Sequence, residues 1–538
     1  MLRRIAGKAL CLGRDERGVA LVLFVIVITP ILILIAVAID FSQFLVMKQQ
    51  LQAAADSAAL DVGKNPSLTD AQATAQAQAY IAANYPAAKS IGTLTSVSVT
   101  RPTTTTVNVT AKATMNTSFL QFMGYNTLPV TVSSQTSIAQ NKMEVVLVLD
   151  NTGSMKQNYG SMTGIAGLQA ASTALVNTLF SADPTGQYVK IAVVPFTAAV
   201  NVGTQYKTAS WIDTKGLGRL TRENLNVPAG EGLITFASQL KNASWGGCVR
   251  QRYEPYDLED VAPSSATPDT LFTPYFAPSE PQGLYNHYLP DGGFPSGTTQ
   301  AQIQYDVTKY QNGVVQGQPN YGPNFTCAVQ PIIPLTNDQT AILAEINAMQ
   351  ASGATVIPAG LVWGWHVISP IVAPVLFPSN AYQPVSYTDT NTIKVIILLT
   401  DGEADVQLTY NYQPPTGPTN GFDKSIYNAY GYGTGPHLNI LALPGTLLGV
   451  QDQPDYNLDQ KEIALCNNIK AVAGASGNPG RILIYAIGFG SVIDNSSLQL
   501  LQQCATNSST YFYNPTSDEL VTTFQSIAVG LNELRLSQ

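Results

Sequence analysis

Five oxygen-bearing side chains occur in three short segments of the chain, and their chemistry suits a divalent cation. Asp150, Thr152 and Ser154 follow one apolar run, Thr355 lies between two expected helices, and Asp401 follows a second apolar run. Carboxylates and hydroxyls are hard oxygen donors, which Mg²⁺ accepts in near-octahedral geometry with retained water. Mn²⁺ and Ca²⁺ are the alternative cations. None of the five residues is Cys or His, so the set does not suit zinc.

A doubly wound α/β sheet would bring the three segments together. Four mostly apolar runs are typical of parallel strands buried on both faces, at 143–149, 190–196, 394–399 and 481–487. Helical periodicity lies between and after these runs, which gives the alternation of such a sheet. Ligand sites in open α/β sheets lie at the carboxyl ends of the strands, near the point where the strand order reverses. We therefore expect the five side chains to meet there.

The helices of this sheet have recognisable starts. Apolar residues at three- and four-residue spacing predict a helix over 165–179 and a short one over 359–368. Capping boxes are predicted at Thr336–Gln339 and at Thr516–Glu519, the second opening a terminal helix. A last edge strand is expected at 510–513, just before that helix.

Catalytic chemistry has few candidate residues in this sequence. The chain has three His (His287, His366 and His437), and no phosphate-cradling Gly-x-x-x-x-Gly-Lys-Ser/Thr loop or Gly-x-Ser-x-Gly elbow. A phosphatase of the haloacid dehalogenase type needs a second Asp where Thr152 stands. We expect neither an enzyme nor a small-molecule substrate.

The charge of the chain is low and unevenly placed. Charged residues make up 12% of the 538 residues, about half of the share usual in globular proteins. Residues 1–17 hold five basic against two acidic side chains, a net +3, which leaves −11 for the rest of a chain whose net charge is −8. An acidic body excludes binding to nucleic acid through a basic surface. A basic head on an acidic body suggests a membrane protein.

The 22 residues Gly18–Ile39 carry no charge. As a helix they would reach ~33 Å, enough for the ~30 Å hydrocarbon core of a bilayer. The positive-inside rule places the basic head, residues 1–17, in the cytoplasm and residues 40–538 across the membrane. A cleaved secretory signal usually has a shorter apolar region. Prepilin-type cleavage after Gly18 is a further alternative, although Leu23 stands where pilin-like helices usually carry Glu.

Beyond the span, residues 40–140 are expected to form a small α+β module. Periodic apolar residues continue the first helix over 40–62 to a stop at Gly63, and an Ala/Gln-rich helix is expected over 69–85. Residues 93–138 have the alternation and β-branched composition of strands. The main domain is expected at 141–538, with two long irregular insertions at 201–335 and 403–458.

The cysteines fit this topology. Cys11 lies on the cytoplasmic side of the span, and the other four Cys lie beyond it. Four Cys in an oxidising compartment allow two disulfides with three possible connectivities. We expect the nearest-neighbour pairs Cys248–Cys327 and Cys466–Cys504; free buried thiols are the alternative.

The three oxygen-bearing segments resemble the metal-ion-dependent adhesion site of von Willebrand factor type A domains. That family has Asp-x-Ser-x-Ser after the first strand, a Thr in a second loop and an Asp in a third. Here Thr152 replaces the first Ser and keeps the hydroxyl. The resemblance implies a Rossmann-like type A fold over 143–538, apart from the insertions. It also implies direct metal ligation by Thr152, Ser154 and Thr355, with Asp150 and Asp401 acting through water and one position left for a partner's carboxylate.

The segment from Arg14 to Ala59 resembles a second family. Its charged head, its apolar span with a central Pro, and Leu51–Asp56 (LQAAAD) are similar to the N-terminal signature of TadE/TadG-like proteins of the bacterial tight-adherence (Flp) pilus system. TadG-like members join this anchor to a type A domain. The resemblance implies an inner-membrane protein of pilus assembly whose periplasmic domain binds a protein partner. The alternative is a minor-pilin-like tip adhesin or surface sensor exposed outside the cell.

Overall fold

The computed structural model of the protein describes residues 16–64, 68–85, 92–103, 106–137, 141–316, 321–327, 330–402, 406, 426–432, 453–472, 481–491 and 493–536. The chain divides into two compact units, residues 1–140 with the last three residues, and residues 141–535. Most of the predicted cytoplasmic head, Cys11 and most of the stretch 403–458 lie outside the described residues.

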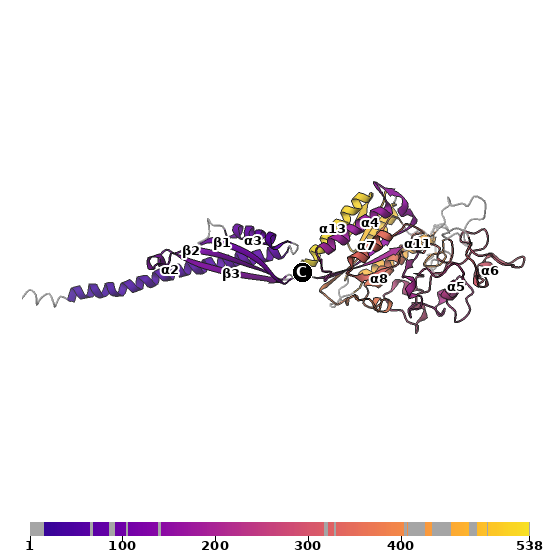
Figure 1. The fold of residues 1–538 in the computed structure, drawn as a ribbon, viewed down its shortest axis with the longest axis horizontal. Coiled ribbons are helices and arrows are strands. Elements are labelled where there is room, and N and C mark those ends of the chain that lie inside the picture. The colour runs from indigo at the N-terminus through magenta and orange to yellow at the C-terminus, as the bar shows by residue number, and fades with distance from the viewer. Residues whose placement is uncertain are drawn as a thin grey trace, which may run out of the picture. The chain divides into compact units, whose positions relative to one another are not determined.

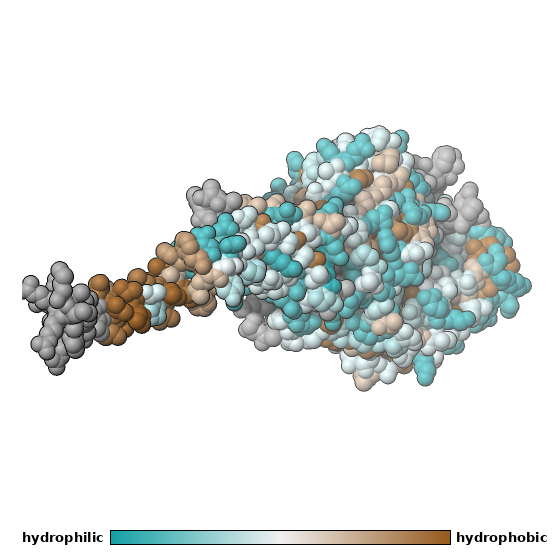
Figure 2. Space-filling model, turned by 60° about the vertical axis from the view of Figure 1, so that its left-hand side comes forward, coloured by the Kyte–Doolittle hydropathy of each residue, from teal (hydrophilic) through white to brown (hydrophobic). Residues whose placement is uncertain are grey.

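Helix α2 (Glu16–Gly63) runs without a break for 48 residues. From Leu21 to Ile35 its apolar side chains are largely exposed, and this helix is long and apolar enough to cross a membrane. Figure 2 shows this apolar surface in brown. Farther along, Met47, Leu51 and neighbouring alanines are buried. The predicted continuation of the helix to Val62 and its end at Gly63 are confirmed.

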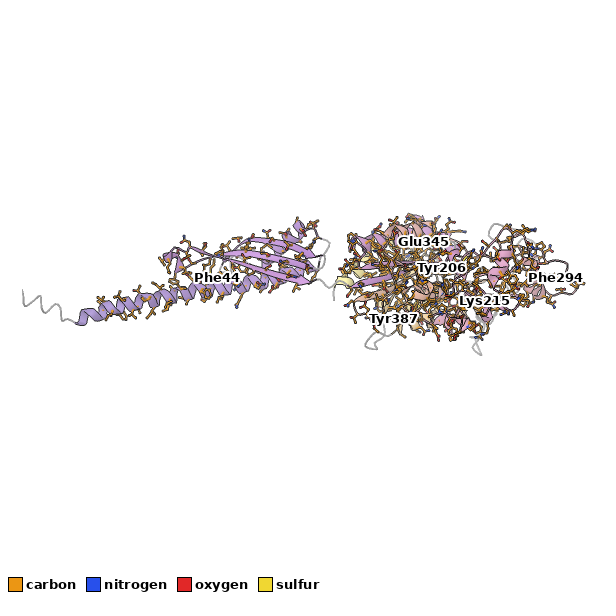
Figure 3. The ribbon with its side chains drawn as sticks, turned by 60° about the horizontal axis from the view of Figure 1, so that its bottom comes forward. Phe44, Tyr206, Lys215, Phe294, Glu345 and Tyr387 are labelled. Carbon is orange, nitrogen blue, oxygen red and sulfur yellow. A yellow bond between two sulfur atoms is a disulfide. The ribbon has the colours of Figure 1, made fainter. Side chains whose placement is uncertain are left out.

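The rest of the first unit packs on the second half of α2 (Figure 1). It consists of α3 (Asp70–Asn84), β1 (Gly92–Thr103), β2 (Thr106–Asn116), the 3-10 turn η1 (Leu120–Met123) and β3 (Thr127–Ser137). The three strands form one antiparallel sheet in the order β1-β2-β3. Alternate residues of β2, such as Val107 and Val109, are buried against the helices, since successive side chains point to opposite faces. Phe44 lies on α2 where the helix reaches this sheet (Figure 3).

An eight-stranded sheet forms the centre of the second unit. Its main path is β13-β12-β11-β4-β7-β8-β9, and β10 also pairs with β7. The five strands β4, β7, β11, β12 and β13 are parallel, whereas β8, β9 and β10 pair antiparallel. The strands are β4 (Lys142–Asp150), β7 (Val189–Phe196), β8 (Val200–Asn201), β9 (Cys248–Val249), β10 (Ile333–Thr336), β11 (Thr392–Thr400), β12 (Ile482–Phe489) and β13 (Tyr511–Asn514).

Helices cover both faces of this sheet, so it is doubly wound as the sequence predicts (Figure 1). One face packs on α4 (Gly164–Ser181), α7 (Gln339–Ala348) and α13 (Ser517–Leu536). The other packs on α8 (Ile357–Ile368), α11 (Gln453–Lys470) and α12 (Asn495–Cys504). Strand β4 serves both cores, because Val145 and Leu147 face the first group and Val146 and Val148 the second.

The described part of the stretch 201–335 is folded, with short elements and its own buried aromatic residues. Its elements are η3 (Thr204–Tyr206), η4 (Arg219–Arg222), α5 (Leu233–Gln239), β9, η5 (Tyr256–Leu258), η6 (Pro268–Thr270), α6 (Gln300–Tyr305), η7 (Thr308–Tyr310) and β10. Figure 3 shows how densely the side chains of this unit fill the space between its elements. Because β10 pairs with β7, the C-terminal end of this stretch belongs to the eight-stranded sheet.

Both disulfides join the pairs expected from the sequence. Cys248 in β9 pairs with Cys327, at a Cα–Cα distance of 5.8 Å. Cys466 pairs with Cys504 at 5.0 Å, which ties α11 to α12. The first closes a loop of 79 residues and the second a loop of 38 residues. Closing such loops restricts the unfolded chain and is worth about 4 kcal/mol each in the chain-entropy model.

One predicted helix start was wrong. The sequence suggested that Thr336 opens a capping box for α7, but Thr336 is the last residue of β10. The N-cap is Asp338, whose carboxylate accepts the N–H of Ala341 at 3.0 Å. Because Thr336 has the extended backbone of the strand, the helix begins two residues later than predicted. The second predicted box is confirmed, because Glu519 accepts the N–H of Thr516 at 3.1 Å.

Candidate metal centre

The first and third oxygen-bearing segments lie side by side at the carboxyl edge of the sheet. Strand β4 ends at Asp150 and β11 ends at Thr400, and the two strands are parallel neighbours with Leu149 opposite Leu399. From β4 the chain goes to β7 on one side, and later to β11 on the other. This reversal of strand order is the place where α/β sheets bind ligands. The prediction that these segments meet at the switch point is confirmed.

Hydrogen bonds join four of the five predicted residues. The Ser154 hydroxyl donates to Asp401 Oδ1 at 2.6 Å, and the hydroxyl oxygens of Thr152 and Ser154 are 2.9 Å apart. The backbone N–H of Thr152 donates to Asp150 Oδ1 at 2.8 Å. Asp150, Thr152 and Asp401 are buried, whereas Ser154 is partly exposed. The carboxylates therefore form the floor of the cluster and Ser154 its open rim.

The loop that carries Thr355 docks on the loop after β4. The N–H of Ser352 donates to the carbonyl of Asn151 at 2.7 Å, and the N–H of Gly153 donates to the carbonyl of Gly353 at 2.9 Å. Gly353 has a φ of +81°, a left-handed conformation that favours glycine. Thr355 is 7% exposed and lies between α7 and α8, as predicted. The structure thus brings the second segment to the same edge.

Two further residues hold the carboxylates, and sequence reasoning did not single them out. The Thr400 hydroxyl donates to Asp150 Oδ2 at 2.6 Å. The Tyr159 hydroxyl donates to Asp401 Oδ2 at 3.1 Å. Thr400 had a detectable signal, because it is the last strand residue before Asp401. Tyr159 had none, since its position depends on the small β5–β6 hairpin (Asn158–Tyr159 and Met162–Thr163).

Burial, and the closeness of the two carboxylates to each other, disfavour the charged form of both Asp150 and Asp401. Burial raises the pKa of Asp401 to about 7, and the charge of Asp150 adds to the shift. Burial also raises the pKa of Asp150, although the hydrogen bonds from Thr152 and Thr400 oppose it. Among the described residues, no Lys or Arg forms an ion pair with either carboxylate. Two buried carboxylates without a positive partner favour a bound cation.

The donor set fits a hard divalent cation. Within the described part of the chain, no group of three or more His, Cys, Asp or Glu residues could hold a metal ion. The cluster instead supplies two carboxylates and the hydroxyls of Thr152 and Ser154, with Thr355 on the adjoining loop. Oxygen donors of this kind suit Mg²⁺, Mn²⁺ or Ca²⁺ better than zinc. The residues predicted from the sequence thus have the chemistry to hold such a cation, and their roles as ligands stay predictions.

Residues 18–65 match the model of the putative Flp pilus-assembly TadE/G-like family, so this segment is similar to that family. The matched residues cover the apolar run, the following helix and the Leu51–Asp56 stretch, on which the resemblance was stated. No curated protein matches the chain in sequence.

Among solved structures, the chain is similar to pilus proteins at low identity. The vWF domain of the type V pili tip protein Mfa5 from Porphyromonas gingivalis is 11% identical, with 74% of this chain and 97% of that chain covered and a TM-score of 0.31. The minor pilin PilB from Streptococcus sanguinis is 11% identical, with 82% and 78% covered and a TM-score of 0.31. The pilus adhesin SpaC from Lactobacillus rhamnosus GG is 12% identical, with 83% covered and a TM-score of 0.32; this chain spans 35% of its length.

Proposed function

We propose that the protein is a membrane-anchored component of Flp pilus assembly that binds a protein partner through a divalent cation. The observation that carries the proposal is the joining, in one chain, of a TadE/G-like anchor and the buried Asp150–Asp401 pair at the sheet edge. The anchor supplies the cellular context, and the carboxylate pair supplies the chemistry. Neither feature alone would connect a cation site with a pilus.

The proposed orientation has the N-terminus in the cytoplasm and the second unit in the periplasm. The net +3 of residues 1–17 favours retention of the head on the cytoplasmic side. The Cys248–Cys327 and Cys466–Cys504 disulfides support an oxidising compartment for the second unit. The apolar first half of α2 is the span between the two.

In the proposed mechanism each residue has a defined task. Ser154, Thr152 and Thr355 present hydroxyls to the cation. Asp150 and Asp401 hold those hydroxyls by hydrogen bonds or through water, and Thr400 and Tyr159 fix the two carboxylates. The cation, when bound, supplies a positive charge. An acidic side chain of the partner can then occupy the coordination position that is left open. The partly exposed Ser154 rim is the side from which the partner approaches.

The test combines direct cation binding with partner capture. Full-length protein in detergent is titrated with Mn²⁺, and envelope extracts are captured on it with Mg²⁺ or with EDTA. Asp150→Ala and Asp401→Ala should abolish cation binding and the EDTA-sensitive capture. Ser154→Ala should weaken both at least tenfold. Ser161→Ala removes an exposed hydroxyl that contacts Asp518 at 3.3 Å, and it should change neither. Equal cation binding by wild type and Asp401→Ala would disprove the mechanism.

A second candidate, a minor-pilin-like tip adhesin, is favoured by the unbroken course of α2 from the apolar run into the module. A long N-terminal helix of this kind could leave the membrane after cleavage at Gly18. Sequencing the N-terminus of the mature protein distinguishes the two candidates. An intact basic head supports the anchored component, and a start at Val19 supports the adhesin.

A further inference from the structure

The connection between β2 and β3 presents large apolar side chains to the outside. Phe122 is 85% exposed, Tyr125 61% and Met123 56%, and Phe119 is also exposed. Residues 117–126 (TSFLQFMGYN) contain no charge. Monomeric soluble proteins rarely expose a contiguous apolar patch of this kind without a binding role. We call residues 117–126 the apolar loop.

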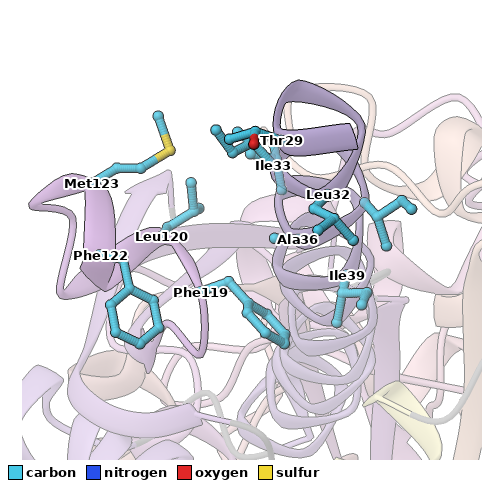
Figure 4. Close-up of a pocket in the computed structure, with 11 residues that line it drawn as sticks. Thr29, Leu32, Ile33, Ala36, Ile39, Phe119, Leu120, Phe122 and Met123 are labelled. Carbon is cyan, nitrogen blue, oxygen red and sulfur yellow. The ribbon is translucent and has the colours of Figure 1, made fainter. Parts of the chain in front are cut away.

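The apolar loop lies beside the outer half of the predicted span. Leu32, Ile33, Ala36 and Ile39 of α2 face Phe119, Leu120, Phe122 and Met123 across a groove of about 410 Å³ (Figure 4). Thr29 also lines this groove, and its hydroxyl is already bonded to the carbonyl of Val25 at 2.7 Å. The groove is therefore apolar on both walls.

The position of the groove along α2 sets its depth in a bilayer. From Leu32 to Ile39 the helix rises ~10 Å, and Ile39 is the last residue of the uncharged run. A loop beside these residues lies at the boundary between headgroups and acyl chains. Amphipathic segments at membrane surfaces bury their apolar faces to ~5–10 Å, and aromatic residues are enriched there.

The backbone of the apolar loop is satisfied from within the protein, as a lipid environment demands. Asp40 accepts the N–H groups of Ser118, Phe119 and Leu120 at 3.0, 2.9 and 2.7 Å. The N–H of Tyr125 donates to the carbonyl of Leu120 at 3.1 Å, and the Thr117 hydroxyl donates to the carbonyl of Tyr125 at 2.5 Å. These bonds hold the turn closed while its side chains point away from the sheet.

We propose that the apolar loop is a second membrane contact, inserted in the leaflet on the C-terminal side of the span, and that phospholipid acyl chains fill the groove between it and α2. Lipid is the occupant because one wall of the groove belongs to the helix that must itself lie in hydrocarbon. A soluble partner cannot reach a surface at that depth. The proposal requires α2 to span the membrane and is independent of the cation site.

Depth-dependent fluorescence quenching tests the proposal. Phe122→Trp is made in the full chain and reconstituted in phosphatidylcholine vesicles whose acyl chains carry bromine, which quenches Trp on contact. The four native Trp (Trp211, Trp245, Trp363 and Trp365) are buried in the second unit, and wild type gives their background. The control is Gln135→Trp, an exposed position on β3 eight residues beyond Thr127 and so ~27 Å along the strand.

The expected result is quenching of the Phe122→Trp variant at least threefold stronger than quenching of the Gln135→Trp variant, and stronger with bromine on the acyl chain than in the headgroup region. Adding Met123→Asp to Phe122→Trp should lower the quenching at least twofold, because a carboxylate resists entry into hydrocarbon. Equal quenching of the two variants would overturn the proposal. A blue-shifted emission from Phe122→Trp that bromine does not quench would also overturn it, since a protein segment would then cover the loop.

Discussion

Asp40 in the first unit and Asp401 in the second unit are both buried carboxylates, but their surroundings differ. Asp40 accepts three backbone N–H groups at the start of η1. Burial alone raises the pKa of Asp40, and these three donors outweigh it and lower the pKa. Asp401 accepts only two hydroxyls, and burial, together with the nearby charge of Asp150, outweighs them and raises its pKa to about 7.

The difference shows how a buried charge reveals its role. The charge of Asp40 is satisfied by donors that the fold provides permanently, so Asp40 is structural. The Asp150–Asp401 pair is left with more negative charge than its hydroxyl partners can balance. Such a pair is stable only when one carboxyl is protonated or when a cation binds. We therefore interpret Asp40 as a structural residue, and the Asp150–Asp401 pair stays the proposed cation site.

The largest effect is expected for Asp40→Ala. This change leaves three N–H groups without their acceptor and should cost the first unit about 3 kcal/mol of unfolding free energy. Hydrogen exchange of the full chain in detergent should show faster exchange at Ser118, Phe119 and Leu120, with the second unit unchanged. Asp56→Ala is the control, since Asp56 is an exposed residue of the same helix with one side-chain bond, to Gln52. If hydrogen exchange at these residues is unaltered in Asp40→Ala, Asp40 does not hold the turn as the structure indicates.

A third buried carboxylate sharpens the comparison through its pH dependence. Glu462 on α11 is fully buried, and among the described residues neither of its oxygens has a hydrogen-bond partner. Burial, and then the charge of Asp459, raises its pKa from 4.5 to about 8. The folded state therefore keeps Glu462 protonated at pH 7. Its contribution to stability is complete below pH 4.5 and is lost as the pH rises through 8.

Glu462→Gln should remove that pH dependence. Between pH 5.5 and pH 7 the unfolding free energy of the wild-type second unit should fall by about 2 kcal/mol more than that of the variant. Urea unfolding at the two pH values measures the difference. Glu533→Gln, at an exposed position on α13, should follow the wild type. If wild type and Glu462→Gln have the same pH slope, Glu462 is charged in the folded protein.

The smallest effect is expected for Asp401→Asn, which should raise the unfolding free energy of the second unit. In EDTA at pH 8, Asp401→Asn should stabilise the second unit by about 1 kcal/mol, because it removes the repulsion from Asp150. Added Mg²⁺ should then stabilise the wild type and leave the variant unchanged. Asp40→Asn should destabilise the first unit in either buffer. Thermal unfolding with and without Mg²⁺ measures all three. If Asp401→Asn instead lowers the stability of the second unit in EDTA, Asp401 stabilises its unit as Asp40 does, and the expected difference between these two residues is absent.

The sequence predicts most of the sheet because its central strands are buried on both faces. Runs such as 143–149 and 394–399 are apolar apart from Glu144 and Lys394, and β4 and β11 begin and end within two residues of them. The two-residue strands β8 and β9 have no measurable period, and most of β10 lies in the stretch 201–335 that was predicted to be irregular, so none was predicted. Helix α12 was also missed, although Asp494 caps it in the ordinary way.

The candidate site was predictable to the extent that strand ends define it. Asp150 and Asp401 follow adjacent strands, and parallel strands end at the same edge. Tyr159 was not predictable. Its hydroxyl lies next to Asp401 only because the chain after η2 (Gly153–Lys156) folds into the β5–β6 hairpin. The predicted hydroxyl roles and the identity of the cation stay predictions.

The continuity of helix α2 has a mechanical consequence. The 24 residues Asp40–Gly63 extend ~36 Å beyond the uncharged run, and the three-stranded sheet is built on them. A membrane helix is commonly tilted by ~20°, which would move the far end of this extension sideways by ~12 Å. In the proposed orientation, a force on the three-stranded sheet would therefore change the tilt of the apolar half of α2 within the bilayer.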